Sequence, residues 1–161
     1  MKHLEYYGLS EEPFSVMPLT QFFYHSDQHD RALEKLHHAV AGVKGLTVVI
    51  GEIGLGKTLL ARRLLENLSE EEYEVSLLVV LHEDVDTLWL LRRIAAQVGV
   101  TDTCDSKVEL ITKLSQRLHT LAEEGKKVVI LIDEAHMLRT RALMEEIRGL
   151  LNLETMDQKL I

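Results

Sequence analysis

The stretch Gly51-Glu-Ile-Gly-Leu-Gly-Lys-Thr58 fills every fixed position of the pattern G-x-x-x-x-G-K-[ST]. Its glycines let the backbone wrap closely around an anion, so that successive N–H groups point inward at phosphate oxygens. A helix that begins at the end of the stretch adds the positive end of its dipole. The pattern therefore predicts a nucleotide-binding loop, with contacts expected from Gly51, Glu52, Ile53, Gly54, Leu55, Gly56, Lys57, Thr58 and Leu59.

Two side chains of this loop have expected roles of their own. Lys57 is predicted to reach the β- and γ-phosphates and to contribute its charge to catalysis, and Thr58 to place its hydroxyl on Mg²⁺. A dinucleotide site is not expected, because the pattern G-x-G-x-x-G cannot be laid on these glycines when position 59 is Leu.

The residues on either side of the loop supply the context that the motif requires. The run Leu46-Thr-Val-Val-Ile50 is short, apolar and β-branched, which predicts a buried parallel strand. Leucines at helical spacing follow the loop. Strand, loop and helix in this order favour a phosphate-binding loop over a glycine-rich turn that fits the pattern by chance.

A second apolar run, Val128-Val-Ile-Leu-Ile132, ends in two acids, Asp133 and Glu134. In parallel α/β sheets ligands lie beyond the carboxyl ends of the strands, so these carboxylates are expected beside the phosphate loop. Asp133 is predicted to hold Mg²⁺, and Glu134 to act as the general base on the attacking water. Many strands end in a polar residue, but an acidic pair downstream of a phosphate loop is a much more specific signal.

Residues 133–136 read Asp-Glu-Ala-His, which also spells the box of one helicase class. That class needs two tandem motor domains, whereas 161 residues supply one at most. The four residues are therefore interpreted as the end of a Walker B strand, with His136 starting a helix.

The remaining segments alternate between helix and strand patterns. Ser26, Asp86 and Ser106 are expected to cap helices, residues 75–81 to form a strand, and residues 140–153 to form the last helix. Residues 1–25 are rich in aromatics and are expected to pack on the domain, as ordinary core packing rather than as a lining for adenine. The whole predicts an α/β fold with a mostly parallel sheet.

Composition restricts the function further. The chain is 46% hydrophobic and 27% charged, as in an ordinary globular domain, and its net charge of −8 gives no support for nucleic-acid binding. Cys104 is the single cysteine, so no internal disulfide forms and a reducing compartment fits. The amino terminus has no signal-peptide pattern, and no apolar run approaches the roughly 20 residues of a membrane span.

Several motifs together resemble the AAA+ ATPases of the GspA/ExeA type, from bacterial general secretion and pilus (MSHA) biogenesis. The resemblance implies a P-loop NTPase fold, a three-layer sandwich, and an ATP-hydrolysing homo-oligomer that uses Mg²⁺ and works with proteins of a secretion or pilus complex. TniB-like transposition ATPases share much of the pattern. The motifs are Tyr7-Gly8-Leu9, Pro13-Phe14, Phe22-Phe23-Tyr24 with Ser26, His29 and Ala32-Leu33, then residues 51–58, 130–138 and 150–155.

The resemblance also implies that the domain is incomplete at its C-terminal end. The chain stops at Ile161, where the family begins its fourth core strand, which precedes sensor 1, the arginine finger and the lid. We therefore expect residues 1–161 to be one truncated AAA+ domain, marginally stable or self-associating through open strand edges. We expect it in the cytoplasm, with a longer parent anchored at the inner membrane by a downstream segment.

Three functions remain open at this point. The first is ATP hydrolysis that powers assembly of a secretion or pilus complex, by attack of water on the γ-phosphate. The second is a nucleotide-dependent switch with little turnover. The third is an ATPase of DNA transposition or replication-loader type. Neither the ring size nor the preference for ATP over GTP follows from the residues.

Overall fold

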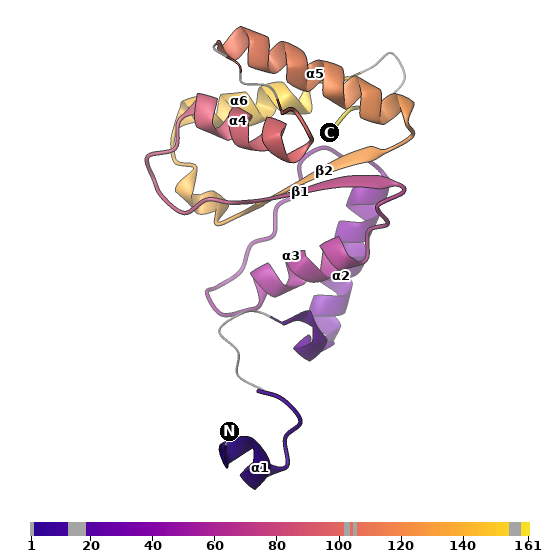
Figure 1. Ribbon diagram of the computed structural model, residues 1–161, viewed down its shortest axis with the longest axis vertical. Coiled ribbons are helices and arrows are strands. Elements are labelled where there is room, and N and C mark those ends of the chain that lie inside the picture. Colours follow the sequence, from indigo (N-terminus) through magenta and orange to yellow (C-terminus); the bar gives the residue numbers. More distant parts are fainter. Residues whose placement is uncertain (1, 13–18, 102–103, 105, 155–158) are drawn as a thin grey trace.

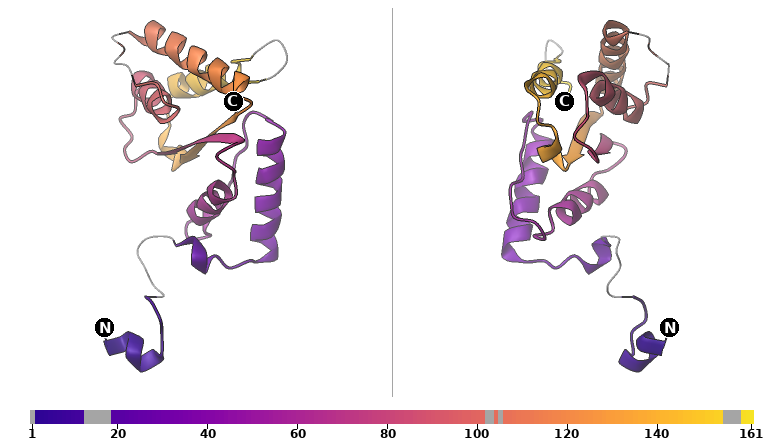
Figure 2. Two further views of the ribbon diagram at one scale, coloured as in Figure 1. Left: turned by 45° about the vertical axis from the view of Figure 1, so that its right-hand side comes forward. Right: turned by 90° about the vertical axis from the view of Figure 1, so that its left-hand side faces the viewer.

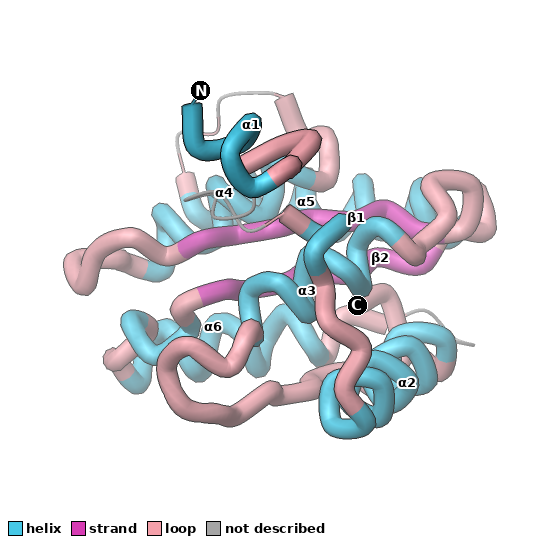
Figure 3. Tube along the Cα trace, turned by 90° about the horizontal axis from the view of Figure 1, so that it is seen from below, coloured by secondary structure: helices cyan, strands magenta, loops and turns pink. Residues whose placement is uncertain are grey.

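The computed structural model describes residues 2–12, 19–101, 104, 106–154 and 159–161, which form a short parallel sheet covered by helices (Figure 1). Strand β1 (Tyr73–Val79) pairs in parallel with β2 (Lys127–Asp133), in a register that runs from Tyr73 opposite Lys127 to Val79 opposite Asp133. The two strands run side by side along their whole length (Figure 3). The expected α/β class with parallel pairing is confirmed.

Helices cover both faces of this sheet (Figure 1). On one face lie α4 (Thr87–Gln97), α5 (Lys107–Glu123) and α6 (Arg141–Leu151). On the other face lie α2 (Asp27–Ala41) and α3 (Lys57–Glu66). The result is the three-layer arrangement expected from the sequence. Among the described helices, none combines the length and the apolar character that crossing a bilayer requires.

Strand β2 separates two hydrophobic clusters because its side chains alternate between the faces. Val128, Ile130 and Ile132 pack on the cluster under α4, α5 and α6, while Val129 and Leu131 pack on the cluster under α2 and α3. The first cluster is rich in fully buried leucines and isoleucine from the helices, namely Leu90, Leu91, Ile94, Leu114, Leu118 and Leu121.

The buried polar group on β1 is satisfied. Ser76 is 2% exposed and its hydroxyl donates to the Gln97 side-chain oxygen on α4. The Gln97 amide nitrogen in turn donates to the Leu77 carbonyl at 2.8 Å. The pair fastens α4 to the edge of β1 without leaving an unpaired polar atom in the core.

Helices α2, α4, α5 and α6 begin where the sequence predicts. Side-chain oxygens of Ser26, Asp86, Ser106 and Thr140 each accept a hydrogen bond from the backbone N–H three residues later. Such caps satisfy a backbone donor that the helix itself leaves unpaired, and each contributes roughly 0.5–2 kcal/mol.

The strand expected at residues 46–50 is wrong in this structure. These residues form no regular structure and pair with no strand, and Val48 and Ile50 are 65% and 91% exposed. Among the described residues β2 pairs only with β1, so no strand lies between β2 and residues 46–50. A cavity of about 140 Å³ lies there instead, lined by Leu46, Thr47, β2 and α6. An apolar run becomes a β-strand only when a neighbouring strand offers backbone groups for its hydrogen bonds.

The amino-terminal aromatic segment is divided between two environments. Helix α1 (Lys2–Tyr7) stands apart from the other helices (Figure 2), and Tyr6 and Tyr7 are 81% and 70% exposed. After the short helix η1 (Thr20–Phe22), Phe23 is buried against α2 and α3. Phe14, Pro13 and Pro18, which belong to the same expectation, lie outside the described residues.

Candidate functional site

The predicted phosphate loop connects the unpaired residues 46–50 to the start of α3. Gly54 and Gly56 have φ angles of 85° and 77°, in the left-handed region that side-chain-bearing residues rarely adopt. Gly56 is the N-cap of α3, and the Leu60 N–H donates to its carbonyl at 2.8 Å. The glycines therefore allow the chain to turn sharply and enter the helix within three residues. As a result, the unpaired N–H groups of the first helical turn lie next to the loop.

The Lys57 side chain folds back over the loop. Its ammonium donates to the carbonyls of Gly51 at 3.0 Å and Glu52 at 2.8 Å. An ammonium has three hydrogens, and its charge here lies beside the backbone of the loop. By contrast, the Ile53 side chain is fully exposed and Leu55 is 56% exposed, so these two predicted contacts would act through their backbone.

The structure brings the two halves of the predicted site together at Thr58 and Asp133. The Thr58 hydroxyl, in the first turn of α3, donates to Asp133 Oδ2 at the end of β2 over 2.9 Å. The residues are 75 positions apart in the chain. The contact follows from the fold, because the carboxyl end of β2 and the amino end of α3 meet at one edge of the sheet.

This oxygen pair fits the chemistry of Mg²⁺. The ion prefers hard oxygen ligands, keeps several waters, and is usually bound through one or two carboxylates together with substrate phosphates. One hydroxyl and one carboxylate are sufficient in such a site. In the described part of the chain, no group of three or more His, Cys, Asp or Glu side chains is placed to hold a metal. A cation here would therefore be shared with phosphate, not enclosed by protein ligands alone.

Glu134 follows Asp133 in a constrained backbone conformation. Its φ of 55° is left-handed, which is uncommon outside glycine, and its N–H donates to Asp133 Oδ1 at 3.0 Å. Its carboxylate, about half exposed, lies 3.1 Å from His136 Nδ1 in the short helix η2 (Ala135–Met137). The sequence assigned no role to His136, but here the histidine contacts the predicted general base. Strained backbone of this kind is frequent at functional sites.

A hollow beside the loop is lined by the aromatic segment. It is lined by Phe22, Phe23 and Tyr24 together with residues of the loop and of α3. Its volume is about 440 Å³. Tyr24 is 79% exposed and Phe22 44% exposed, so these rings are available to the hollow while Phe23 also belongs to the core.

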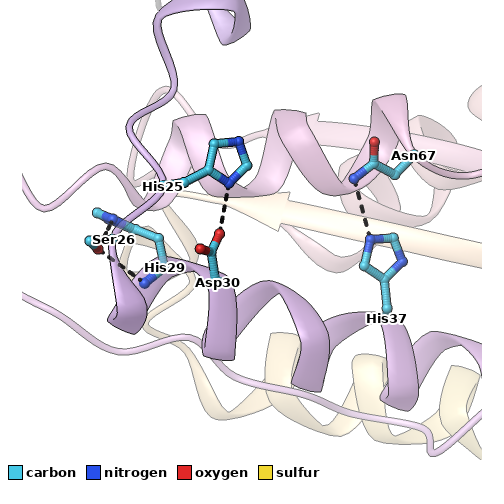
Figure 4. Close-up of polar contacts among 6 residues, drawn as sticks. All are labelled: His25, Ser26, His29, Asp30, His37 and Asn67. Carbon is cyan, nitrogen blue, oxygen red and sulfur yellow. Dashed lines mark hydrogen bonds and ion pairs between the residues drawn. The ribbon is translucent and has the colours of Figure 1, made fainter.

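Sequence reasoning placed His29 in a family motif but assigned it no role in the site. The histidine lies in the first turn of α2, and its Nδ1 contacts Ser26 Oγ (Figure 4). Its Nε2 contacts the carbonyl of Leu55 in the loop. The local sequence predicts the helix start, but a contact between a side chain and a carbonyl 26 positions away leaves no signal in spacing or hydropathy.

Comparison with known proteins identifies the family of the chain. The AAA domain family matches residues 40–161, a range that contains the loop, Asp133 and Glu134. The chain is 34% identical over 161 residues to General secretion pathway protein A of Aeromonas hydrophila, an alignment that covers 99% of this chain and 28% of that protein. The chain thus spans less than a third of the length of this relative. No solved structure matches the chain.

Proposed function

The chain belongs to the AAA domain family, and from this premise we propose that it binds ATP with Mg²⁺ and hydrolyses the γ-phosphate. The loop at residues 51–58 would bind the phosphates, and the acids at the end of β2 would complete the site. The observation that carries the proposal is the 2.9 Å contact between Thr58 and Asp133, which joins the two motifs in one place.

Each group of this chain has a defined part in the proposed reaction. Backbone N–H groups of the loop and of the first turn of α3 bind the phosphate oxygens, and Lys57 moves its ammonium from the loop carbonyls to the β- and γ-phosphates. Thr58 and Asp133 hold Mg²⁺, which when bound neutralises charge on the phosphates. Glu134 orients a water for in-line attack and accepts its proton.

The relative suggests what the hydrolysis is used for. General secretion pathway protein A shares 34% identity with this chain, so we extend the proposal to a homo-oligomeric module that powers assembly of a secretion or pilus complex. We place this step on the cytoplasmic side, where ATP is available, with the whole protein held at the inner membrane. The partners and the membrane attachment are proposed for the whole protein.

One observation favours a second function, a nucleotide-dependent switch with slow turnover. The Glu134 carboxylate lies 3.1 Å from His136 Nδ1, and a base held by this neighbour is not free to orient water. In that case ATP would bind and change the partners of the protein, and hydrolysis would begin only when the pair separates. The net charge of −8 gives no comparable support to a DNA-associated ATPase.

The experiment that tests the proposal measures Mg·ATP binding by calorimetry and phosphate release by the same protein. Lys57→Ala should weaken ATP binding by about 100-fold, because a charged hydrogen-bonding partner of the phosphates is lost. Lys35→Ala is the matched control, since Lys35 is an exposed lysine on α2. Equal affinity of the wild type and Lys57→Ala would overturn the loop assignment. Tight binding of Mg·ATP without phosphate release would favour the second function, the nucleotide-dependent switch.

A further inference from the structure

We propose that His29 is a positioning residue that fastens the phosphate loop to the start of α2, through the chain of contacts Ser26–His29–Leu55. The proposal deepens the proposed function and rests on it, since it concerns how the loop is held for phosphate. His29 Nε2 lies 3.0 Å from the Leu55 carbonyl oxygen, and Nδ1 lies 2.7 Å from Ser26 Oγ. Figure 4 shows His29 beside Ser26 at the start of the helix.

The chemistry of the two neighbours assigns the hydrogen on the ring. A carbonyl oxygen only accepts, so Nε2 carries the hydrogen and donates it to Leu55. In the neutral ring Nδ1 is then an acceptor, and the Ser26 hydroxyl donates to it. Ser26 Oγ at the same time accepts the His29 N–H at 3.3 Å as the helix cap. One serine thus both starts α2 and sets the tautomer that the loop contact needs.

The contact with Leu55 also orients the next amide of the loop. In a trans peptide the C=O of one residue and the N–H of the next point in opposite directions. Holding the Leu55 carbonyl toward His29 therefore turns the Gly56 N–H away from the histidine. That N–H immediately precedes Lys57 and Thr58, so the histidine acts on one of the donors that the loop offers to phosphate.

Packing around the ring keeps this geometry in place. The ring of Phe23 meets the His29 ring edge-on, with centroids 5.6 Å apart. On the other side, a Cβ added at Gly56 would lie 3.5 Å from His29 Nε2, so the ring rests directly on the glycine backbone. Phe23 itself is buried among residues of α2 and α3, so the histidine ring packs against a side chain that the core holds in place.

The loop needs such an attachment because little else restrains its middle. Ile53 is fully exposed, and the preceding residues 46–50 have no ladder. Glycines increase the number of conformations that the loop can adopt. A loop already held in one conformation loses less freedom when phosphate binds, which raises affinity without any contact between His29 and the ligand.

Substitutions at position 29 separate positioning from general packing. His29→Ala should weaken binding of both Mg·ATP and Mg·ADP by about three- to tenfold, the range for loss of one hydrogen bond. His29→Gln should restore most of the affinity, since its amide offers an acceptor oxygen and a donor NH₂ group at similar reach. His29→Asn is shorter by one carbon and should not. His38→Ala, an exposed histidine on the same helix, is the control.

A second measurement needs no nucleotide. Hydrogen exchange of the amides of residues 51–57 should be faster in His29→Ala and near the wild-type rate in His29→Gln, with exchange in α4 and α5 unchanged. Unchanged loop exchange in His29→Ala, or equal acceleration throughout the protein, would overturn the inference. If Lys57→Ala binds ATP as tightly as the wild type, the proposed function fails, and the exchange experiment still decides the role of His29.

Discussion

The two halves of the site are held in different ways. Asp133 ends a strand with seven paired residues whose side chains enter two hydrophobic clusters. The phosphate loop follows an unpaired segment, residues 46–50, in which Ile50 is 91% exposed and no ladder forms. The acidic half is therefore fixed by the core, while the loop half depends on contacts of its own, namely the bond from Thr58 to Asp133 and that from His29 to Leu55. The site thus combines a strand end that is fixed by the core with a loop that is held by a few hydrogen bonds.

The largest effect that bears on this contrast is expected at Glu134. Glu134→Gln removes the base but keeps the size and most hydrogen-bonding capacity of the side chain, so phosphate release should fall about 10²–10⁴-fold while Mg·ATP affinity stays near the wild-type value. Phosphate release with saturating Mg·ATP checks this. Glu145→Gln, on the exposed face of α6, is the control. Turnover that survives Glu134→Gln would remove this residue from the chemistry and leave the rigid half with Asp133 alone.

Stability should show the same contrast between the halves. Leu78→Ala, at a fully buried position of β1, should lower the free energy of unfolding by about 2–5 kcal/mol, because it leaves a cavity in the larger cluster. Ile50→Ala, in the unpaired segment before the loop, should change it by less than about 0.5 kcal/mol. Urea unfolding of both variants measures the difference. Similar losses would mean that residues 46–50 are packed in solution.

A smaller effect than those at Glu134 and Leu78 is expected at the metal. Asp133→Asn keeps the shape of the side chain and an oxygen for Thr58 but removes the charge, so the Mg²⁺ concentration for half-maximal ATP binding should rise about tenfold. A titration with Mg²⁺ at fixed ATP checks this. Glu83→Gln, in the exposed loop after β1, is the control. An unchanged Mg²⁺ requirement would separate Asp133 from the metal and leave its bond to Thr58 as a purely structural link.

The features that sequence predicts well here are the local ones. Caps at Ser26, Asp86 and Ser106 depend on residues three apart, and all three are present. The meeting of Thr58 and Asp133 is predicted by a rule of parallel sheets, although the residues are far apart in sequence.

The features that sequence reasoning missed depend on distant neighbours. Residues 46–50 have the composition of a strand, but pairing needs a partner strand that composition does not reveal. The contact of His29 with Leu55 joins a side chain to a backbone carbonyl, and any residue at position 55 would present the same oxygen. The left-handed conformation of Glu134 could not be predicted from its residue type, because residues other than glycine, asparagine and aspartate seldom adopt it.

The alternation along β2 has a consequence for the evolution of the protein. Every residue from 128 to 132 packs on one hydrophobic cluster or the other, so within these five positions of the strand no mutation escapes selection for packing. Helices differ, because each keeps an outer face that can drift in sequence. Among the elements of the fold, β2 should therefore change most slowly, and accepted substitutions there should be exchanges among Val, Ile and Leu.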